Sequence, residues 1–492
     1  MMPNLRYPVR GIACLGLALG LAACTSDVPT SNEFRSTSDA ASAPNGTVAV
    51  CHKPGVADTI LRIDASALPA HLAHGDYITT LLVSHEPARP ADGIHFGRIG
   101  DALDAARAER MARGELTSAF CRITILVADG TYRGTAVSAA SADIEQFPMI
   151  VDVPDITLRG ALVMGLDDAG RATGTGVGPA ASTLTPVEPM PVRNGVSIPI
   201  IVDNAHPNGS AGNGLVIEGF VFQSGHDPQV DAGGQAILGL RTTGLTIQGN
   251  RFEGGFTESL DLRGLTGDVM QNHLSGTAGT CDICFAGPGN YRGEGNRLLA
   301  GGIPGITVDG PVGLGVPDGV EPFVLPASAE TFADLENNYI TDHNRTPVGV
   351  GIRLDALGVS GPNVITTMHA VLRDNLLVNN RFGVIIHAAF PAVNTALHGD
   401  IDATLDGNVI QQSCETALLV SFSRHVQTLG VSPKPQPFLQ NSTFRLTITG
   451  DPDWSTAWYG NPDGFGNTLI VNGQEIPNGT VESYSDAGCP GQ

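Results

Sequence analysis

Side chains able to bind a metal gather in one short segment, "CHKPGVADTILRIDASALPAHLAHGD" (51–76). His71 and His74 are three residues apart in a stretch that predicts a short helix ending at Gly75, so both imidazoles share one face. A ligand set of this kind suits zinc or copper, and its members are Cys51, His52, His71, His74 and Asp76. The competing interpretation is a small structural module in which Cys51 is held in a disulfide and the histidines cap or pack.

A second group of reactive side chains lies in strand-like segments such as "GITVDG", "GIRLDAL" and "GVIIHAAF". Aligning the inward apolar residues places Asp261, Asp282, Thr307, Arg353, Ile385 and Leu419 in one outward column. The next column then contains Arg263, Cys284, Asp309, Asp355, His387 and Ser421.

Asp309 and Asp355 fall in neighbouring repeats, where their carboxylates would stand about 5 Å apart. That spacing suits acid/base or nucleophilic chemistry on a glycosidic bond. Arg353 and His387 beside them could hold a uronate or move a proton. These four residues are the candidate catalytic group, and the alternative is that an outward polar column contains acids by chance.

The segments "GLVIEGFVFQSG" (214–225) and "GLTIQGNRFEGG" (244–255) share one pattern of apolar, Gly and polar positions. We expect the structural unit that repeats in this way to position the side chains above. Each copy alternates apolar and polar residues, which is the period of a strand. Asparagines recur in the copies at spacings of 22, 24, 42, 37 and 33 residues, as Asn250, Asn272, Asn296, Asn338, Asn375 and Asn408. Copies this short bury their apolar faces only by stacking about 4.8 Å apart. We expect each Asn to adopt the left-handed turn and its amide to hydrogen-bond along the stack.

On these residues the chain resembles the right-handed parallel β-helix, or pectate-lyase-like, superfamily over roughly 123–445. The resemblance implies an all-β, right-handed, single-stranded parallel β-helix, a fold that hosts many chemistries and some non-enzymes. The longer spacings predict inserted loops, notably 311–334.

The two ends of such a stack need covering. An N-terminal amphipathic capping helix is predicted by "GRIGDALDAARAERMARGE", whose apolar residues Ile99, Leu103, Ala106 and Met111 lie near helical spacing. At the other end, the segment with Trp454, Trp458 and Tyr459 predicts a C-terminal cap, with a sugar-stacking platform as the alternative.

The N-terminus has the organisation of an export signal. Arg6 and Arg10 precede an apolar stretch (11–22) too short to span a bilayer as a stable helix. Leu-Ala-Ala before Cys24 resembles a bacterial lipobox, which implies that Cys24 becomes the lipidated first residue of the mature protein. The protein would then be anchored through its lipid at the outer membrane or cell surface. An ordinary secretory signal is the alternative.

The net charge limits the classes of binding partner, and the cysteine content indicates the cellular compartment. Removal of residues 1–23 leaves 25 Lys and Arg against 49 Asp and Glu, a net charge of −24 that repels nucleic acid. The six remaining cysteines suggest disulfides in an exported protein, and we predict the pairs Cys51–Cys121 and Cys414–Cys489. For the Cys-x-x-Cys at 281–284 we predict a structural bridge at a kink, or two separate partners.

The predicted organisation is a lipoprotein signal peptide (1–23), a flexible tether (24–46), a small Cys/His module (47–85), a capping helix region (86–122), a parallel β-helix (123–445) and a C-terminal cap (446–492). Segment 51–76 also resembles a Cys-His-Pro…His-Leu-x-His-Gly-Asp module that recurs in exported bacterial proteins.

The function predicted from these features is a cell-envelope lipoprotein whose β-helix presents an extended surface for glycans or envelope partners. The alternative is a polysaccharide lyase or glycoside hydrolase acting on an extracellular polysaccharide. The binding interpretation is favoured because the chain has no run of the paired-Asp and Arg-x-Lys type found in polygalacturonases. The sequence leaves open whether the protein is an enzyme.

Overall fold

The chain divides into two compact units, 1–35 and 36–492, and every residue that the structure describes lies in the second. This computed structural model describes 46–52, 59–85, 93–135, 144–178, 180–186, 199–203, 211–225, 234–277, 279, 281–301, 304–309, 328–344, 349–355, 365–387, 398–421, 441–449, 456–459 and 466–477. The predicted signal peptide, Cys24, the tether up to residue 45, and Cys489 lie outside the described residues.

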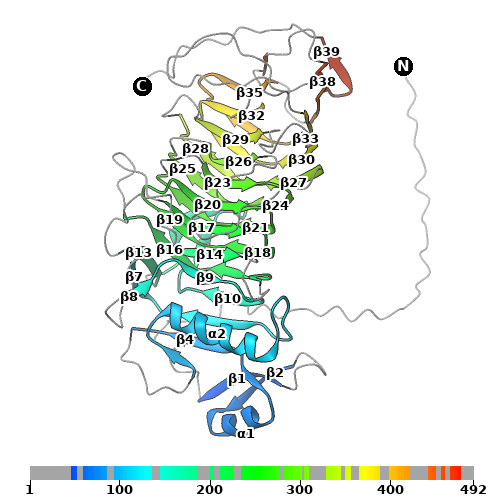
Figure 1. Ribbon diagram of the computed structural model, residues 1–492. Helices are drawn as coiled ribbons and strands as arrows, with labels where there is room; N and C mark the ends of the chain where they lie inside the picture. The colour runs from blue at the N-terminus through cyan, green and yellow to red at the C-terminus, as the bar shows by residue number, and fades with distance from the viewer. Residues whose placement is uncertain are drawn as a thin grey trace, which may run out of the picture. The chain divides into compact units, whose positions relative to one another are not determined.

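The β-helix consists of three parallel sheets that the chain visits in turn (Figure 1). In one coil it forms β18 (Thr243–Gln248), β19 (Arg251–Glu253) and β20 (Glu258–Arg263), one strand in each sheet. The next coil adds β21 (Thr266–Met270) beside β18 and continues in the same order. The predicted right-handed, single-stranded parallel β-helix is confirmed.

Sheet 1 contains, in spatial order, β5 (His95–Phe96), β4 (Thr80–Val83), β6 (Ile123–Val127), β10 (Ile156–Arg159), β15 (Val216–Glu218), β18, β21, β24 (Gly289–Glu294), β27 (Ser328–Glu336), β30 (Ile365–Arg373), β33 (His398–Asp406), β36 (Thr443–Thr449), β38 (Thr468–Val471) and β39 (Gln474–Ile476). Sheet 2 contains β8 (Ile144–Gln146), β7 (Gly130–Thr135), β13 (Ser182–Pro186), β16 (Phe220–Gln223), β19, β22 (His273–Ser275), β25 (Arg297–Leu299), β28 (Tyr339–Thr341), β31 (Leu376–Val378) and β34 (Val409–Gln411). Sheet 3 contains β9 (Met149–Val151), β14 (Ile200–Asp203), β17 (Gln235–Leu240), β20, β23 (Cys281–Ala286), β26 (Ile306–Asp309), β29 (Val350–Asp355), β32 (Phe382–His387), β35 (Thr416–Ser421) and β37 (Thr456–Tyr459). A separate hairpin pairs β11 (Met164–Leu166) with β12 (Ala172–Gly176).

The core lies between the three sheets, where alternate residues of each strand point inward. The aliphatic residues predicted to be inward are at most 1 % exposed, namely Ile247, Leu262, Ile352 and Ile386. Aromatic rings also stack from coil to coil, with the ring centroids of Phe222 and Phe252 4.9 Å apart. The predicted burial is confirmed.

A ladder of asparagine amides runs along the turn between sheets 1 and 2. The side-chain Nδ2 of Asn272 donates to Oδ1 of Asn296 at 3.1 Å, and Nδ2 of Asn296 donates to Oδ1 of Asn338 at 3.0 Å. That Oδ1 of Asn296 also accepts the backbone N–H of Asn272 at 3.0 Å. The same contacts link all six asparagines from Asn250 to Asn408, so the predicted axial hydrogen bonding is confirmed.

The left-handed residue of each turn is the one before the asparagine, and in this respect the prediction was wrong. Gly249, Gln271 and Gly295 have φ values of 62°, 54° and 64°. Placing the left-handed residue one position earlier leaves the following asparagine buried, with its amide directed along the stack. Gly is favoured there because it lacks the Cβ that makes positive φ costly.

Helix α2 (Ile99–Arg113) packs against β4 and β6 at the N-terminal end of the coils. Ile99, Leu103 and Ala106 are buried as predicted, but Met111 is 44 % exposed. Arg110 occupies the buried face instead, because it follows Ala106 by one helical turn.

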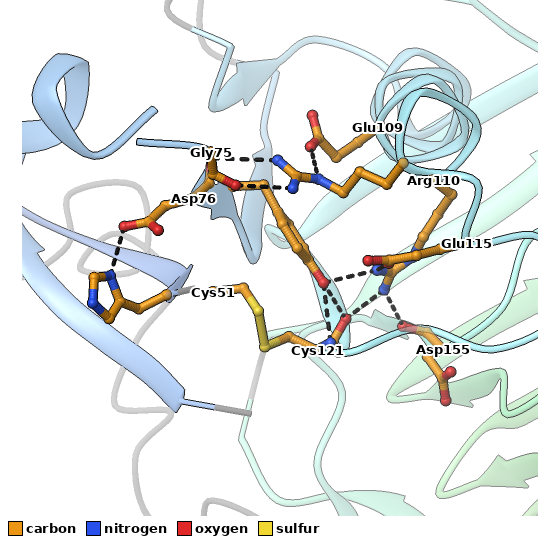
Figure 2. Close-up of a disulfide and its surroundings, with 11 residues drawn as sticks. Cys51, Gly75, Asp76, Glu109, Arg110, Glu115, Cys121 and Asp155 are labelled. Carbon is orange, nitrogen blue, oxygen red and sulfur yellow. Dashed lines mark hydrogen bonds and ion pairs between the residues drawn. A yellow bond between two sulfur atoms is a disulfide. The ribbon is translucent and has the colours of Figure 1, made fainter. Parts of the chain in front are cut away.

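Arg110 tolerates complete burial because its N–H groups all find acceptors (Figure 2). Nη1 donates to the Tyr77 hydroxyl at 3.0 Å and to the Glu115 carboxylate at 2.5 Å. Nη2 donates to the carbonyls of Cys121 and Asp155, and Nε donates to the carbonyl of Pro154. The guanidinium therefore joins the helix, the first module and the first coils.

The N-terminal module is a three-stranded sheet with β1 (Thr47–His52) between β2 (Thr59–Asp64) and β3 (Tyr77–Ile78). The 3-10 helix η2 (Ala65–Ala67) and helix α1 (Leu68–Ala73) connect β2 to β3. The predicted Cys51–Cys121 disulfide is confirmed and ties β1 to the first coil, whereas the predicted Cys414–Cys489 bond involves a residue outside the described part. None of the helices in the described segments is long and apolar enough to cross a membrane.

Near the C-terminus the coils continue further than the cap predicted at 446–492. Strand β36 pairs with β33, and β37, which includes Trp458, pairs with β35. The antiparallel pair β38–β39 then ends sheet 1. Part of the inserted loop predicted at 311–334 is strand, because β27 begins at Ser328, and residues 311–327 lie outside the described part of the chain. Trp454 lies outside the described residues.

We expect Asn296→Ala to lower the free energy of unfolding by at least about 2 kcal/mol, because it leaves the buried N–H of Asn272 without its acceptor. Chemical denaturation followed by circular dichroism measures this change. Asn290→Ala, an exposed position in β24, is the matched control and should be nearly neutral. Equal effects of the two substitutions would contradict a structural role for the ladder.

Candidate active site

The outward face of sheet 3 brings the predicted catalytic residues together. Asp309 of β26 pairs in register with Asp355 of β29, which pairs in register with His387 of β32. Neighbouring parallel strands are about 4.8 Å apart, so these three side chains occupy consecutive rungs of one column. Arg353 lies two residues before Asp355 on the same face, and its Nη2 donates to Oδ1 of Asp309 at 3.3 Å.

Strand alternation explains why these side chains point out of the core. Val308, Leu354 and Ile386, which precede the three column residues, are each fully buried in the interior. Adjacent residues of a strand face opposite sides, so Asp309, Asp355 and His387 share the outer face. The residues predicted from sequence as one group are therefore neighbours.

At two positions of the predicted columns, the structure has a different residue. Asp261 pairs with Cys284, and Arg263 pairs with Ala286, whereas the sequence alignment placed Asp282 and Cys284 at those positions. The error is a shift of two residues, which keeps the inside–outside alternation and therefore leaves no trace in the hydrophobic pattern. Asp282 is fully buried, and its carboxylate contacts Nε2 of His343 at 2.9 Å.

A buried carboxyl group on β20, that of Asp261, extends the site and was not included in the predicted catalytic group. Asp261 is 1 % exposed and accepts a hydrogen bond from Nε of Arg263 at 2.8 Å. The amide of Gln235 donates to both Asp261 and Glu258, each at 2.5 Å. Asp261 and Arg263 stood in the outward columns of the sequence alignment, but the pattern alone did not reveal the burial of Asp261.

Burial changes the proton affinity of two carboxyl groups. Burial raises the pKa of Asp261 to about 7, although Arg263 beside it acts in the opposite direction. The pKa of Asp309 is also raised by burial, against the opposing charge of Arg353. Arg263, two rungs away across the small side chain of Ala286, also acts to lower the pKa of Asp309. Asp261 is therefore able to donate a proton near neutral pH, and Asp309 holds its proton to a higher pH than an exposed aspartate does.

Exposure differs along the column. The side chains of Asp309 and Arg353 are 19 % and 16 % exposed, whereas Asp355 and His387 are 3 % and 5 % exposed as residues. Solvent thus reaches the site mainly at Asp309 and Arg353.

Cys281 and Cys284 form a disulfide within β23, on the same sheet. Their Cα atoms are 5.7 Å apart, well below the roughly 10 Å that three residues of a regular strand span. The chain therefore bends here, and the predicted structural bridge at a kink is confirmed. Neither sulfur is available as a thiolate.

The predicted metal residues separate into two groups. His52, His71 and Asp76 converge, with Nδ1 of each histidine facing Oδ2 of Asp76. Cys51 is held in its disulfide and His74 is exposed at the end of α1, so neither joins that group.

The fold and this face define the protein as a right-handed parallel β-helix with an acidic cluster on sheet 3. No protein-family model matches the sequence, and comparison with curated proteins finds no match.

Solved structures that resemble the chain are β-helix proteins of low sequence identity. The DFA-IIIase of Arthrobacter chlorophenolicus A6 in complex with GF2 is 12 % identical, with 80 % of this chain and 94 % of that chain covered and a TM-score of 0.43. The A-module of the Azotobacter vinelandii mannuronan C-5 epimerase AlgE4 is 11 % identical, with coverages of 79 % and 94 % and a TM-score of 0.33. The catalytic unit of the GH87 alpha-1,3-glucanase of Streptomyces thermodiastaticus strain HF3-3 is 16 % identical, with coverages of 80 % and 70 % and a TM-score of 0.33. These likenesses concern the fold.

The raised pKa of Asp261 predicts a pH-dependent stability. The folded protein holds a proton on Asp261 up to about pH 7, whereas the unfolded chain releases it near the ordinary value of about 3.9. The contribution of this group is therefore fully present below about pH 4 and is lost as the pH rises to about 7, at up to about 1.4 kcal/mol per unit.

Asp261→Asn has no such proton to lose and should show a flatter stability profile over that range. Denaturant unfolding at intervals between about pH 4 and about pH 8 measures it. The control is Asp168→Asn at an exposed turn, which should follow the parent profile. Parallel profiles for the parent and Asp261→Asn would show that Asp261 titrates normally.

Proposed function

We propose that the protein is a glycoside hydrolase whose active site is the outward face of sheet 3. One observation carries the proposal: Asp309 and Asp355 are direct register partners on adjacent strands. Their strand separation of about 4.8 Å is close to the roughly 5–5.5 Å between the two carboxyl groups of retaining glycosidases.

The environments of the two carboxyl groups suggest different roles. Asp309, whose pKa is raised by burial, is suited to protonate the leaving oxygen and later to activate water. Asp355 is then the nucleophile that attacks the sugar carbon and forms the covalent glycosyl intermediate. Arg353 orients Asp309 through its hydrogen bond, and His387 occupies the next rung as a binding group for sugar hydroxyls.

The cationic groups of the site favour a neutral glycan because they are already engaged. Arg263 contacts Asp261 and Arg353 contacts Asp309, so both guanidinium groups have a protein partner. A lyase acting on a uronate needs a cation or metal free to bind the substrate carboxylate and a base for proton abstraction. The chain contains two lysines, Lys53 and Lys434, and neither lies in a sheet 3 strand. Hydrolysis of a neutral polysaccharide therefore fits these residues better than elimination.

A non-catalytic role in glycan binding is the second candidate, and a groove on sheet 1 favours it. This groove has a volume of about 730 Å³ and contains Phe332, which is 41 % exposed and stacks on His369 at 4.9 Å between ring centroids. Asp402 lies beside them, with its Oδ2 3.8 Å from Nδ1 of His369 and its Oδ1 3.4 Å from Nη1 of Arg445. Exposed rings flanked by hydrogen-bonding groups suit the apolar face and hydroxyls of a sugar.

Hydrolysis should be lost in Asp309→Asn and Asp355→Asn, with rates at least about 10²-fold below the parent, because each removes an acid/base or nucleophilic group. The measurement is reducing-end release from a panel of neutral polysaccharides, with ultraviolet absorbance as a check for unsaturated lyase products. Asp168→Asn should keep full activity.

A folded parent that cleaves nothing in the panel, but whose retention on a glycan resin depends on Phe332, would favour the binding role. Unsaturated products whose formation requires Arg353 would favour a lyase.

We further propose that the protein acts at the cell envelope, held by a lipid on Cys24. Support comes from the lipobox-like "LAAC" and the polar segment after it, which has the composition of a tether. Cys24→Ser should release the protein from the membrane fraction, and the parent should incorporate labelled fatty acid. A parent that remains unlabelled, with unchanged fractionation of the variant, would refute the lipid anchor.

A further inference from the structure

Two imidazoles and one carboxylate converge in the N-terminal module, remote in sequence from sheet 3. Nδ1 of His52 lies 2.8 Å from Oδ2 of Asp76, and Nδ1 of His71 lies 2.6 Å from the same oxygen. The Asp76 side chain is fully buried, whereas His52 and His71 are 29 % and 25 % exposed. Three ligand atoms from three segments thus lie within 4.8 Å of one another, open to solvent on the imidazole side.

The surrounding structure holds Asp76 and the strand next to His52 in place (Figure 2). The Cys51–Cys121 disulfide fixes β1 immediately before His52. Arg113 of α2 donates to the carbonyl of Gly75 at 2.9 Å and to that of Asp76 at 3.4 Å. Its guanidinium also lies 4.3 Å from the centre of the Tyr77 ring. The turn that carries Asp76 is therefore anchored by a neighbouring helix before any ligand binds.

We propose that His52, His71 and Asp76 bind one Zn²⁺ ion through the two Nδ1 atoms and Oδ2. Two imidazole nitrogens and one carboxylate oxygen form a donor set that zinc accepts, with a fourth position left for water. Bonds of about 2.0–2.1 Å place tetrahedral ligand atoms about 3.3 Å apart, so Nδ1 of His52 needs to move outward by about 0.5 Å and Nδ1 of His71 by about 0.7 Å. The partly exposed histidines have room for that movement.

This ligand set differs from the broad set expected from the sequence. Cys51 supplies no thiolate because it is oxidised, and the exposed His74 lies outside the converging group. Without a thiolate the site suits Zn²⁺ better than Cu(I), which prefers soft sulfur ligands. Bound metal would join β1, α1 and the turn before β3, and so stabilise a module too small for an extensive core.

The competing account is a hydrogen-bonded triad, in which each imidazole donates Nδ1–H to Asp76 and no metal binds. The buried carboxylate of Asp76 has partners in either case. The number of zinc ions bound per protein therefore distinguishes the two accounts. The proposal is independent of the hydrolase function, because none of its residues lies in the β-helix coils.

The test uses the full mature chain without a histidine tag. After removal of metal with a chelator, Zn²⁺ is titrated against a chromogenic competitor, and bound zinc is counted by mass spectrometry. We expect one equivalent of zinc in the parent and at least a tenfold loss of affinity in His52→Ala and in His71→Ala. His74→Ala, three residues from His71 on the same helix end, is the matched control and should bind like the parent.

A second readout reports the coordination of the metal directly, in the folded parent and in the control. Cobalt substituted for zinc should give the visible absorption of a four-coordinate nitrogen–oxygen site in the parent and in His74→Ala, and lose it in His71→Ala. The proposal is overturned if the parent binds no zinc, or if His74→Ala loses zinc as His71→Ala does. It is equally overturned if the double variant His52→Ala and His71→Ala keeps its equivalent of zinc.

Discussion

The hydrogen bonds between stacked asparagine amides set the position of each coil relative to the next. Every amide from Asn250 to Asn408 bridges two coils and also satisfies a backbone group in the turn. Strand side chains alternate with a period of two, so a slip of one residue would move the outward acids of sheet 3 into the core. The asparagine ladder between sheets 1 and 2 therefore helps to keep Asp309 and Asp355 next to each other on sheet 3.

The sequence predicts this framework well because its signals are redundant. Six asparagines, alternating aliphatic residues and the glycines between strands all indicate the same stack, and one irregular coil does not obscure the others. The candidate site followed from the same alignment, since the segments that contain Asp309, Asp355 and His387 have similar apolar patterns. What the structure adds is the pairing that makes them consecutive rungs.

The failures have a common physical origin in contacts that a linear pattern does not carry. A shift of two residues in β23 preserves every inside–outside assignment. The sequence pattern therefore places Asp282 beside Asp261, whereas the register partner of Asp261 is Cys284. Met111 was predicted on the buried face of α2 because its side chain is apolar. Arg110 is buried there instead, because hydrogen-bond acceptors from distant segments surround its guanidinium. Likewise, the proton affinity of Asp261 depends on burial that no local motif announces.

The antiparallel pair β38–β39 at the end of sheet 1 bears on how such molecules behave in crowded solution. A stack of parallel strands is a template that another copy could extend, since its last strand offers the same hydrogen-bond pattern as every strand before it. Reversing the chain at Asn472 and Gly473 replaces that pattern with one of opposite direction, on a strand of only three residues. The reversal thus opposes end-to-end polymerisation into fibres at this edge.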